Sequence, residues 1–115
     1  MELSVDADRL QADIEANAAF GAIEFDDPAL RGRTNRTGTA ANQAARDYFV
    51  DRLRDAGLAV TIDAIGNILG VWAPSSADAN AAPIVSGSHL DSVPEGGIFD
   101  GPLGVYAALE AVRTM

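Results

Sequence analysis

Residues 85–104 read VSGSHLDSVPEGGIFDGPLG and contain the only histidine of the chain together with two aspartates. The apolar residues at the start of this stretch predict a short buried strand over residues 84–89. A glycine-rich loop over residues 90–101 then leads to a helix that starts near Pro102, because proline suits the first turn of a helix. Ligands of α/β proteins gather beyond the carboxyl ends of strands, where a strand passes into a loop and a helix. His89 lies at such a position.

His89 and Asp91 are two residues apart, so in an extended chain their side chains project from the same face. The Asp91 carboxylate can then reach the imidazole and determine which ring nitrogen is free to bind a metal ion. Asp100 follows on the loop, where it could return a second carboxylate to the same metal. The segment therefore contains the side-chain types of a metal site.

Each of these residues also has a simpler interpretation. A single histidine is often a hydrogen-bonded structural residue, and Asp100 directly precedes the predicted helix start, where an N-cap would lie. Ser88 beside His89 could indicate a nucleophile, but the chain contains no G-x-S-x-G sequence. The glycines of residues 96–104 could hold an anion at a helix start, although their spacing matches no phosphate-binding motif.

Two earlier segments have the apolar spacing of helices. Residues 6–20 place apolar side chains four apart, with Asp6 as the predicted N-cap and Gly21 as the predicted stop. Residues 39–56 carry apolar side chains on one face and are followed by Gly57, which predicts a second helix. The residues that define the two apolar faces are Leu10, Ile14, Ala18, Ala41, Ala45, Tyr48, Phe49, Leu53 and Ala56.

The remaining segments predict a hairpin and two loops. Residues 58–64 alternate in polarity, and Gly66 and its neighbour separate them from the apolar run 68–72, which predicts a β-hairpin. Residues 22–38 predict an irregular loop, and residues 74–83 predict an exposed low-complexity loop. The order helix, helix, hairpin, strand and helix predicts an α/β fold. It is incomplete, because three strands and a final helix without a stop signal leave the sheet unfinished.

Charge and composition narrow the function classes. The 115 residues carry 17 acidic and 8 basic side chains, for a formal net charge of -9, and every basic residue is arginine. Such a surface argues against a nucleic-acid partner. The lysine-free, acidic composition suggests a halophilic cytoplasm, where salt screens the self-repulsion. Because the chain has no cysteine, any metal must be bound by carboxylate, imidazole or water.

The amino-terminal residues are acidic and form no signal sequence. No stretch approaches the roughly 18 apolar residues of a membrane span. These features predict a cytoplasmic protein without a membrane partner.

Residues 87–105, GSHLDSVPEGGIFDGPLGV, resemble the first metal-site motif of the hydantoinase/carbamoylase-type zinc amidases, such as the N-carbamoyl-L-amino-acid hydrolases and allantoate amidohydrolases. That family belongs to the aminoacylase and carboxypeptidase clan of dinuclear metallohydrolases. Residues 44–48, 55–58 and 63–70 resemble the family's amino-terminal region in the same order. The resemblance implies that residues 1–115 are the amino-terminal portion of one α/β/α zinc-exopeptidase-like catalytic domain, without the lid and dimerisation domain.

The same resemblance implies a role for each candidate site residue. His89 would be a ligand of one metal ion, Asp91 would orient its imidazole during catalysis, and Asp100 would bridge two ions. The family's cofactors are two divalent ions, zinc or manganese, and its substrates are small carbamoyl or ureido compounds whose C–N bond is hydrolysed. N-carbamoyl-L-amino acids, ureidopropionate and allantoate are all candidate substrates. For the full-length protein the resemblance implies a homodimer.

Several parts of the family pattern have no counterpart in this chain. The Glu-Glu pair that supplies the general base and a ligand, and two further histidines, are absent from the 115 residues. We therefore expect the chain by itself to be inactive and to bind metal weakly or not at all, because one histidine and one bridging aspartate cannot fix two ions. Two alternatives stay open: a truncated non-catalytic remnant or partner-dependent module, and a peptidase of the same clan.

Overall fold

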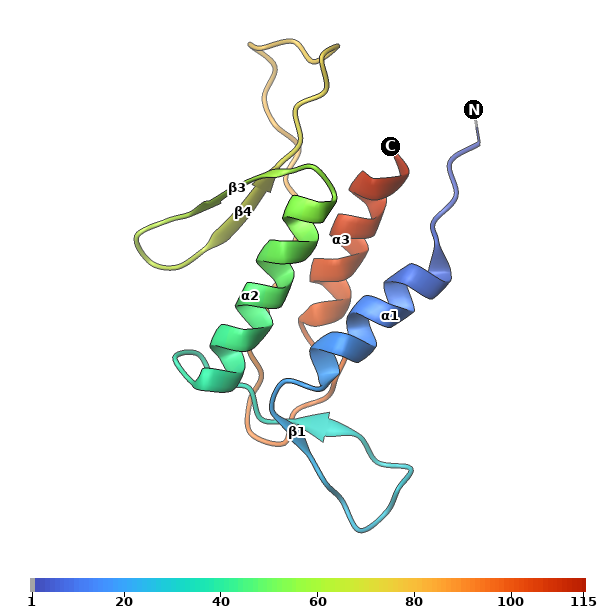
Figure 1. The fold of residues 1–115 in the computed structure, drawn as a ribbon, viewed down its shortest axis with the longest axis vertical. Coiled ribbons are helices and arrows are strands. Elements are labelled where there is room, and N and C mark those ends of the chain that lie inside the picture. The colour runs from blue at the N-terminus through green and yellow to red at the C-terminus, as the bar shows by residue number, and fades with distance from the viewer. Residues whose placement is uncertain (1) are drawn as a thin grey trace.

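A computed structural model describes residues 2–115 as three helices and two short antiparallel sheets (Figure 1). The elements in chain order are α1 (Ala7–Ala18), β1 (Ala22–Ile23), β2 (Gly32–Arg33), α2 (Ala40–Asp55), β3 (Ala59–Ile62), β4 (Ile68–Val71) and α3 (Pro102–Thr114). The mixed α/β class that the sequence predicts is confirmed. No helix in this part of the chain is long and apolar enough to cross a membrane.

The first two helices begin and end where the sequence predicts. The Asp6 side chain accepts a hydrogen bond from the Arg9 backbone N–H at 2.9 Å and caps α1. The Thr39 side chain accepts from the Asn42 N–H and caps α2. Gly57 follows α2 with φ of 82°, a left-handed conformation that favours glycine. These local signals set the helix ends because each satisfies backbone groups that the helix leaves unpaired.

The third helix differs from prediction at its start. Pro102 occupies its first turn as expected, but the N-cap is Gly101 and no side chain caps the helix. The N-cap interpretation of Asp100 is therefore wrong. Gly101 has φ of 92°, and this left-handed turn moves the cap position one residue beyond the aspartate.

The predicted hairpin is confirmed, and the predictions for residues 22–38 and 84–89 are corrected. β3 and β4 form the predicted antiparallel hairpin, with Ala59 opposite Val71 and Ile62 opposite Ile68. Residues 22–38 are not wholly irregular, because β1 and β2 pair within them. A two-residue pair is too short to leave a periodic pattern in the sequence.

The predicted buried strand over residues 84–89 is wrong. The structure assigns no strand there, and Ile84 and Val85 are 100% and 82% exposed. Among residues 2–115 this segment has no neighbouring strand, and a β-strand needs a hydrogen-bonded partner to satisfy its backbone groups. The apolar residues of this segment predicted burial, but no other part of the described chain covers them.

The core lies between the three helices and the hairpin. Figure 1 shows α1 and α2 on either side of α3, and the β3–β4 hairpin beside the end of α2. Tyr106 of α3 is completely buried and contacts the rings of Tyr48 and Phe49 from α2. The buried apolar residues that pack together are Ile14, Leu53, Leu58, Val105, Tyr106 and Leu109. Packing of this kind fixes α3, the helix whose first turn borders the candidate site.

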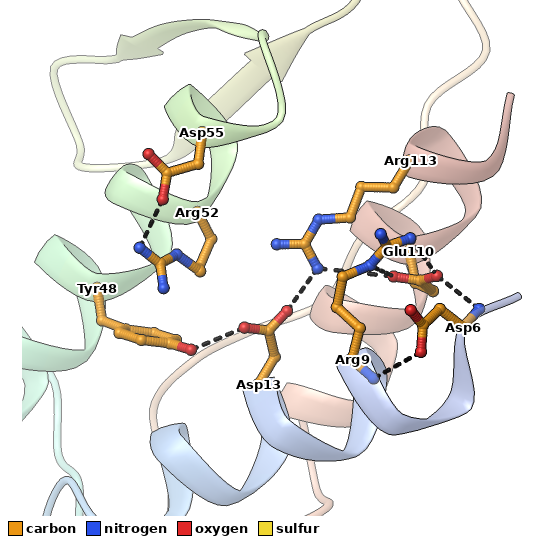
Figure 2. Close-up of polar contacts among 8 residues, drawn as sticks. All are labelled: Asp6, Arg9, Asp13, Tyr48, Arg52, Asp55, Glu110 and Arg113. Carbon is orange, nitrogen blue, oxygen red and sulfur yellow. Dashed lines mark hydrogen bonds and ion pairs between the residues drawn. The ribbon is translucent and has the colours of Figure 1, made fainter.

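Buried carboxylates also join the helices (Figure 2). Glu110 of α3 is 1% exposed and accepts from both the Nε and Nη2 of Arg9, at 2.8 and 2.7 Å. Asp13 of α1 accepts from the Tyr48 hydroxyl at 2.7 Å and from Arg113 Nη1 at 2.6 Å. These charge-assisted bonds orient α1 and α2 relative to α3.

Replacing Glu110 by glutamine tests this network. The change removes the carboxylate that pairs with the partly exposed Arg9, so we expect the free energy of unfolding to fall by about 2 kcal/mol. The Arg9 hydrogen bond lowers the pKa of Glu110. The folded chain therefore binds fewer protons at this group, and the stabilisation is present above the ordinary carboxyl range and lost as the pH falls through the lowered folded pKa. Urea denaturation at neutral and acidic pH measures both effects.

The exposed Glu24 supplies the matched control for that measurement. Glu24→Gln makes the same chemical change at a surface position and should leave the free energy of unfolding nearly unchanged. The network interpretation is contradicted if Glu110→Gln is as stable as Glu24→Gln, or if it loses stability on acidification as steeply as the wild-type chain.

Exposed apolar side chains on the hairpin and the following segment predict self-association. We expect the chain to be oligomeric or poorly soluble in dilute buffer. In salt of about 1 M it should be more compact, because repulsion between its acidic side chains is screened beyond roughly 3 Å. Light scattering across a salt series measures this, and a monodisperse monomer with cooperative unfolding in dilute buffer would contradict it. The side chains concerned are Ile62, Ile65, Leu69, Val71, Trp72, Ile84 and Val85.

Candidate metal-ligand site

The loop that carries the candidate residues is attached to β2 and the residues after it. The backbone N–H of Arg33 donates to the carbonyl of Gly96, and the Gly96 N–H donates to the carbonyl of Arg33, both at 2.9 Å. Ser92 N–H donates to the Asn35 carbonyl at 2.8 Å, and Asn35 N–H donates to Ser92 Oγ at 2.9 Å. The start and the middle of the loop are therefore held in place by backbone geometry as well as by side chains.

His89 and Asp91 lie in contact at the start of this loop. The Nδ1 of His89 is 3.2 Å from the Asp91 carboxylate oxygen Oδ1 and 3.1 Å from the Asp91 backbone carbonyl oxygen. Both neighbours are acceptors, so a neutral ring would carry its proton on Nδ1 and leave Nε2 with a free lone pair. The two side chains are 50% and 45% exposed, which leaves the ring accessible from solvent.

Gly101, the residue that follows Asp100, packs against His89. The backbone at Gly101 lies so close to the His89 ring that a Cβ atom there would be 2.6 Å from Nδ1 and would also overlap the His89 carbonyl oxygen. A Cβ at Gly104, one turn later in α3, would be 2.8 Å from the Cβ of Ser88. The first turn of α3 thus packs directly against residues 88–89, and only glycine permits that approach.

Arg33 lies buried beneath the same loop. It is the largest fully buried side chain among residues 2–115. Its Nη1 donates to the Leu90 carbonyl at 2.9 Å and its Nη2 donates to the Asp91 carbonyl at 3.2 Å. Burial lowers the pKa of Arg33, and attraction to the carboxylates of Asp91 and Asp100 opposes that change. The guanidinium keeps its charge because its ordinary pKa lies far above neutral pH.

The donor set fits a metal ion only in part. An imidazole whose Nδ1 faces a carboxylate and whose Nε2 is free is the usual form of a metal-binding histidine. Over residues 2–115, however, no three histidine, aspartate or glutamate side chains converge into a group that could hold an ion. The described residues therefore do not form a complete coordination sphere.

The other sequence-based alternatives receive little support from the geometry. Within the described residues Ser88 makes no hydrogen bond with His89, whose Nδ1 faces Asp91 instead. The Gly96 N–H already donates to the Arg33 carbonyl, so it is not free to bind an anion. A shallow depression of about 450 Å³ does lie beside Asp91, lined by Arg36, Thr37, Asp91, Ser92, Val93 and Pro94.

Sequence reasoning missed the residues that support the site. Arg33 stands in a stretch with Arg31 and Arg36, and nothing in the local pattern separates the buried member from the other two. Arg31 pairs with Glu15 and Arg36 is exposed. The glycines at positions 101 and 104 were visible as a glycine-rich loop, but their close approach to residues 88–89 depends on tertiary packing.

Comparisons with known proteins give a consistent result over almost the whole chain. No model of a known protein family matches it. An N-carbamoyl-L-amino acid amidohydrolase of Geobacillus stearothermophilus is 46% identical over 84 residues, covering 73% of this chain and 20% of the relative. A ureidoglycolate hydrolase of Oryza sativa subsp. japonica is 36% identical over 111 residues, covering 96% of this chain and 22% of the relative.

A solved structure agrees with these sequence relatives. The crystal structure of a hydantoinase/carbamoylase family amidase from Burkholderia ambifaria superposes with a TM-score of 0.85 at 42% identity. The match covers 97% of this chain and 26% of that one. The chain therefore spans about a quarter of the length of the proteins it resembles.

The contact between Gly101 and His89 generates a prediction. Gly101→Ala places a Cβ against the ring and the carbonyl of His89 at a residue with φ of 92°. We expect the free energy of unfolding to fall by more than about 1 kcal/mol, since alanine at positive φ is strained even without a clash. The single histidine should also change its ring NMR signals, so chemical denaturation and histidine NMR together measure the effect.

Alanine substitutions at two other glycines serve as controls that distinguish backbone strain from steric overlap with His89. Gly38→Ala places alanine at φ of 85° with no atom within 4 Å of the new Cβ, so it reports backbone strain alone. Gly97→Ala has neither a positive φ nor a close neighbour and should be nearly neutral. If Gly101→Ala costs no more than Gly38→Ala and leaves the histidine signals unchanged, the close approach does not constrain His89.

Proposed function

Because the chain belongs to the hydantoinase/carbamoylase family of amidases, we propose that it is part of a metal-dependent hydrolase of carbamoyl or ureido C–N bonds. The observation that carries the proposal is the contact of His89 Nδ1 with Asp91, at 3.2 Å to the carboxylate, next to the turn that holds Asp100. A histidine whose second nitrogen is fixed by a carboxylate is suited to metal binding. The identity of 46% with an N-carbamoyl-L-amino acid amidohydrolase supports the reaction class.

Each candidate residue takes one role in this proposal. His89 would hold one of two divalent ions, zinc or manganese, through its free Nε2. Asp91 holds the ring by its contact with Nδ1, and Asp100 would be the carboxylate shared between the two ions. When bound, divalent ions of this kind supply Lewis acidity to hydrolysis. The chain's own residues hold and orient; none of them is assigned the general base.

The proposed activity requires more than this chain. No complete ligand set forms within residues 2–115, and the relatives are about four to five times as long as the segment they share with it. The general base, the remaining ligands and the homodimer interface are proposed to lie in the parts of such a protein outside these 115 residues. The incomplete site favours one alternative, a non-catalytic module that functions only with a partner chain.

The surroundings of Asp91 support an anionic, amino-acid-like substrate. Arg36 is exposed and lines the depression beside Asp91. An arginine at such a position can bind a carboxylate through two parallel hydrogen bonds. N-carbamoyl-L-amino acids and ureidoglycolate-type compounds both carry a carboxylate next to the carbamoyl or ureido group, so both remain candidate substrates.

The first test is the intact mass of the native product, followed by an activity assay on that product. We expect a polypeptide several times heavier than this chain that hydrolyses an N-carbamoyl-L-amino acid when zinc or manganese is supplied. In that product Asp100→Ala and His89→Ala should each lower the rate by at least about a hundredfold, because each removes a metal ligand.

The exposed Asp26 offers a control of the same chemistry away from the site. Asp26→Ala should leave the hydrolysis rate unchanged. A native product of about the chain's own size, inactive with either metal, would favour the non-catalytic module. A long, active product whose rate survives both site substitutions would contradict the ligand assignment while leaving the family assignment intact.

A further inference from the structure

We propose that Arg33 is the positioning residue of the candidate site and acts on His89 through the backbone carbonyl of Asp91. That carbonyl oxygen is shared: it lies 3.2 Å from Arg33 Nη2 and 3.1 Å from His89 Nδ1. A carbonyl oxygen has two lone pairs and can accept two hydrogen bonds at once. Arg33, the Asp91 carbonyl and His89 thus form a continuous chain of contacts from the interior to the exposed ring.

The Arg33 side chain is built to hold this stretch of backbone. It is completely buried, and its two terminal nitrogens donate to two successive carbonyls, those of Leu90 and Asp91. A planar guanidinium presents its donors in a fixed fork, so two bonds to successive carbonyls restrict both position and orientation of the loop. A flexible lysine would make at most one of these bonds with the same geometry.

The chemistry of its contacts shows that Arg33 does more than fill space. Burying a cation is costly unless it is paired, and Arg33 makes no salt bridge within the described residues. Its Nε also lacks a hydrogen-bond partner in that part of the chain. The carboxylates that attract it, Asp91 and Asp100, are the two carboxylates of the candidate site. Its donors therefore hold the backbone at Leu90 and Asp91, next to the proposed ligand His89, and its charge faces the two carboxylates of the candidate site.

This inference rests on the proposed function only in taking His89 as a ligand. The contact itself predicts a property of the metal-free chain: the neutral His89 ring should carry its proton on Nδ1, because the fixed Asp91 carbonyl is an acceptor. The chain has one histidine, so ¹⁵N labelling of that residue type gives one unambiguous pair of ring signals. The measurement is made at a pH above which these signals no longer change, so that they report the tautomer of the neutral ring.

The experiment compares wild-type chain with Arg33→Lys and Arg33→Gln. Lysine keeps the charge without the fork, and glutamine keeps one amide donor without the charge. In both variants we expect the ring signals to move from the Nδ1–H pattern toward a mixture of tautomers, with the larger change in Arg33→Gln. Where wild-type chain binds zinc measurably, the variants should bind it about tenfold more weakly, the usual effect of losing a group that orients a ligand.

Arg54→Gln serves as the matched control, because Arg54 is exposed on α2 and lies 3.9 Å from its nearest acidic partner, Asp51. It should leave both the tautomer and the zinc affinity unchanged. Folded Arg33 variants that keep the wild-type tautomer would overturn the proposal. If neither variant folds, the wild-type chain decides the question: scalar couplings across hydrogen bonds from Arg33 Nη to the Leu90 and Asp91 carbonyls support it, and their absence overturns it.

Failure of the proposed function gives a different pattern. If wild-type chain binds no zinc, as its incomplete ligand set allows, the tautomer measurement alone tests the positioning role, and the His89→Ala assay on the longer native product tests the ligand assignment. A tautomer that depends on Arg33 together with zinc binding that depends on His89 supports both proposals.

Discussion

The close approach of the first turn of α3 to the backbone of residues 88–89 is the constraint on which the candidate site depends. It requires glycine at positions 101 and 104, since a Cβ at either would overlap Ser88 or His89. The loop between His89 and Gly101 must therefore return to its own starting point, which places the residue after Asp100 against His89. Carboxylates are favoured near the amino-terminal end of a helix, and Asp100 directly precedes the N-cap of α3.

The position of α3 is in turn set by buried polar pairs as much as by the apolar core. Glu110 and Asp13 bind Arg9 and Arg113 and join α1 to α3 (Figure 2). In a chain without lysine every such partner is arginine, whose planar fork holds a carboxylate or a pair of carbonyls in one orientation. Arg33 uses the same property on backbone carbonyls beneath the loop. A single unpaired charge would destabilise the interior, but these charged side chains are paired or hydrogen-bonded and hold the helices and the loop in position.

Local signals in the sequence predicted the elements whose determinants are local. Asp6, Thr39 and Pro102 mark helix starts, and the alternating segment before Gly66 marks the hairpin. The strand predicted over residues 84–89 failed because pairing is a tertiary property, and apolar residues alone do not supply a neighbouring strand. The β1–β2 pair was missed for the related reason that two residues carry no period.

The candidate site likewise has a part that local sequence spacing predicted and a part that depends on tertiary contacts. The spacing of His89 and Asp91 correctly places the carboxylate against the ring, because a separation of two residues is a local relation. Their roles as ligand and orienting residue stay predictions. Arg33 acts across 58 residues of chain to reach the Asp91 carbonyl, and no local pattern distinguishes it from Arg31 or Arg36.

The distribution of exposure bears on what such a site is for. A structural histidine in a core satisfies both ring nitrogens with buried partners. His89 instead satisfies one nitrogen with Asp91 and leaves half of its side chain open to solvent, while the groups that hold the loop, Arg33 and Asn35, are completely buried. Rigid support on one side and access on the other are what a metal ligand needs. The accessible side of His89 is therefore the side from which an ion, and ligands supplied by other residues, would have to approach.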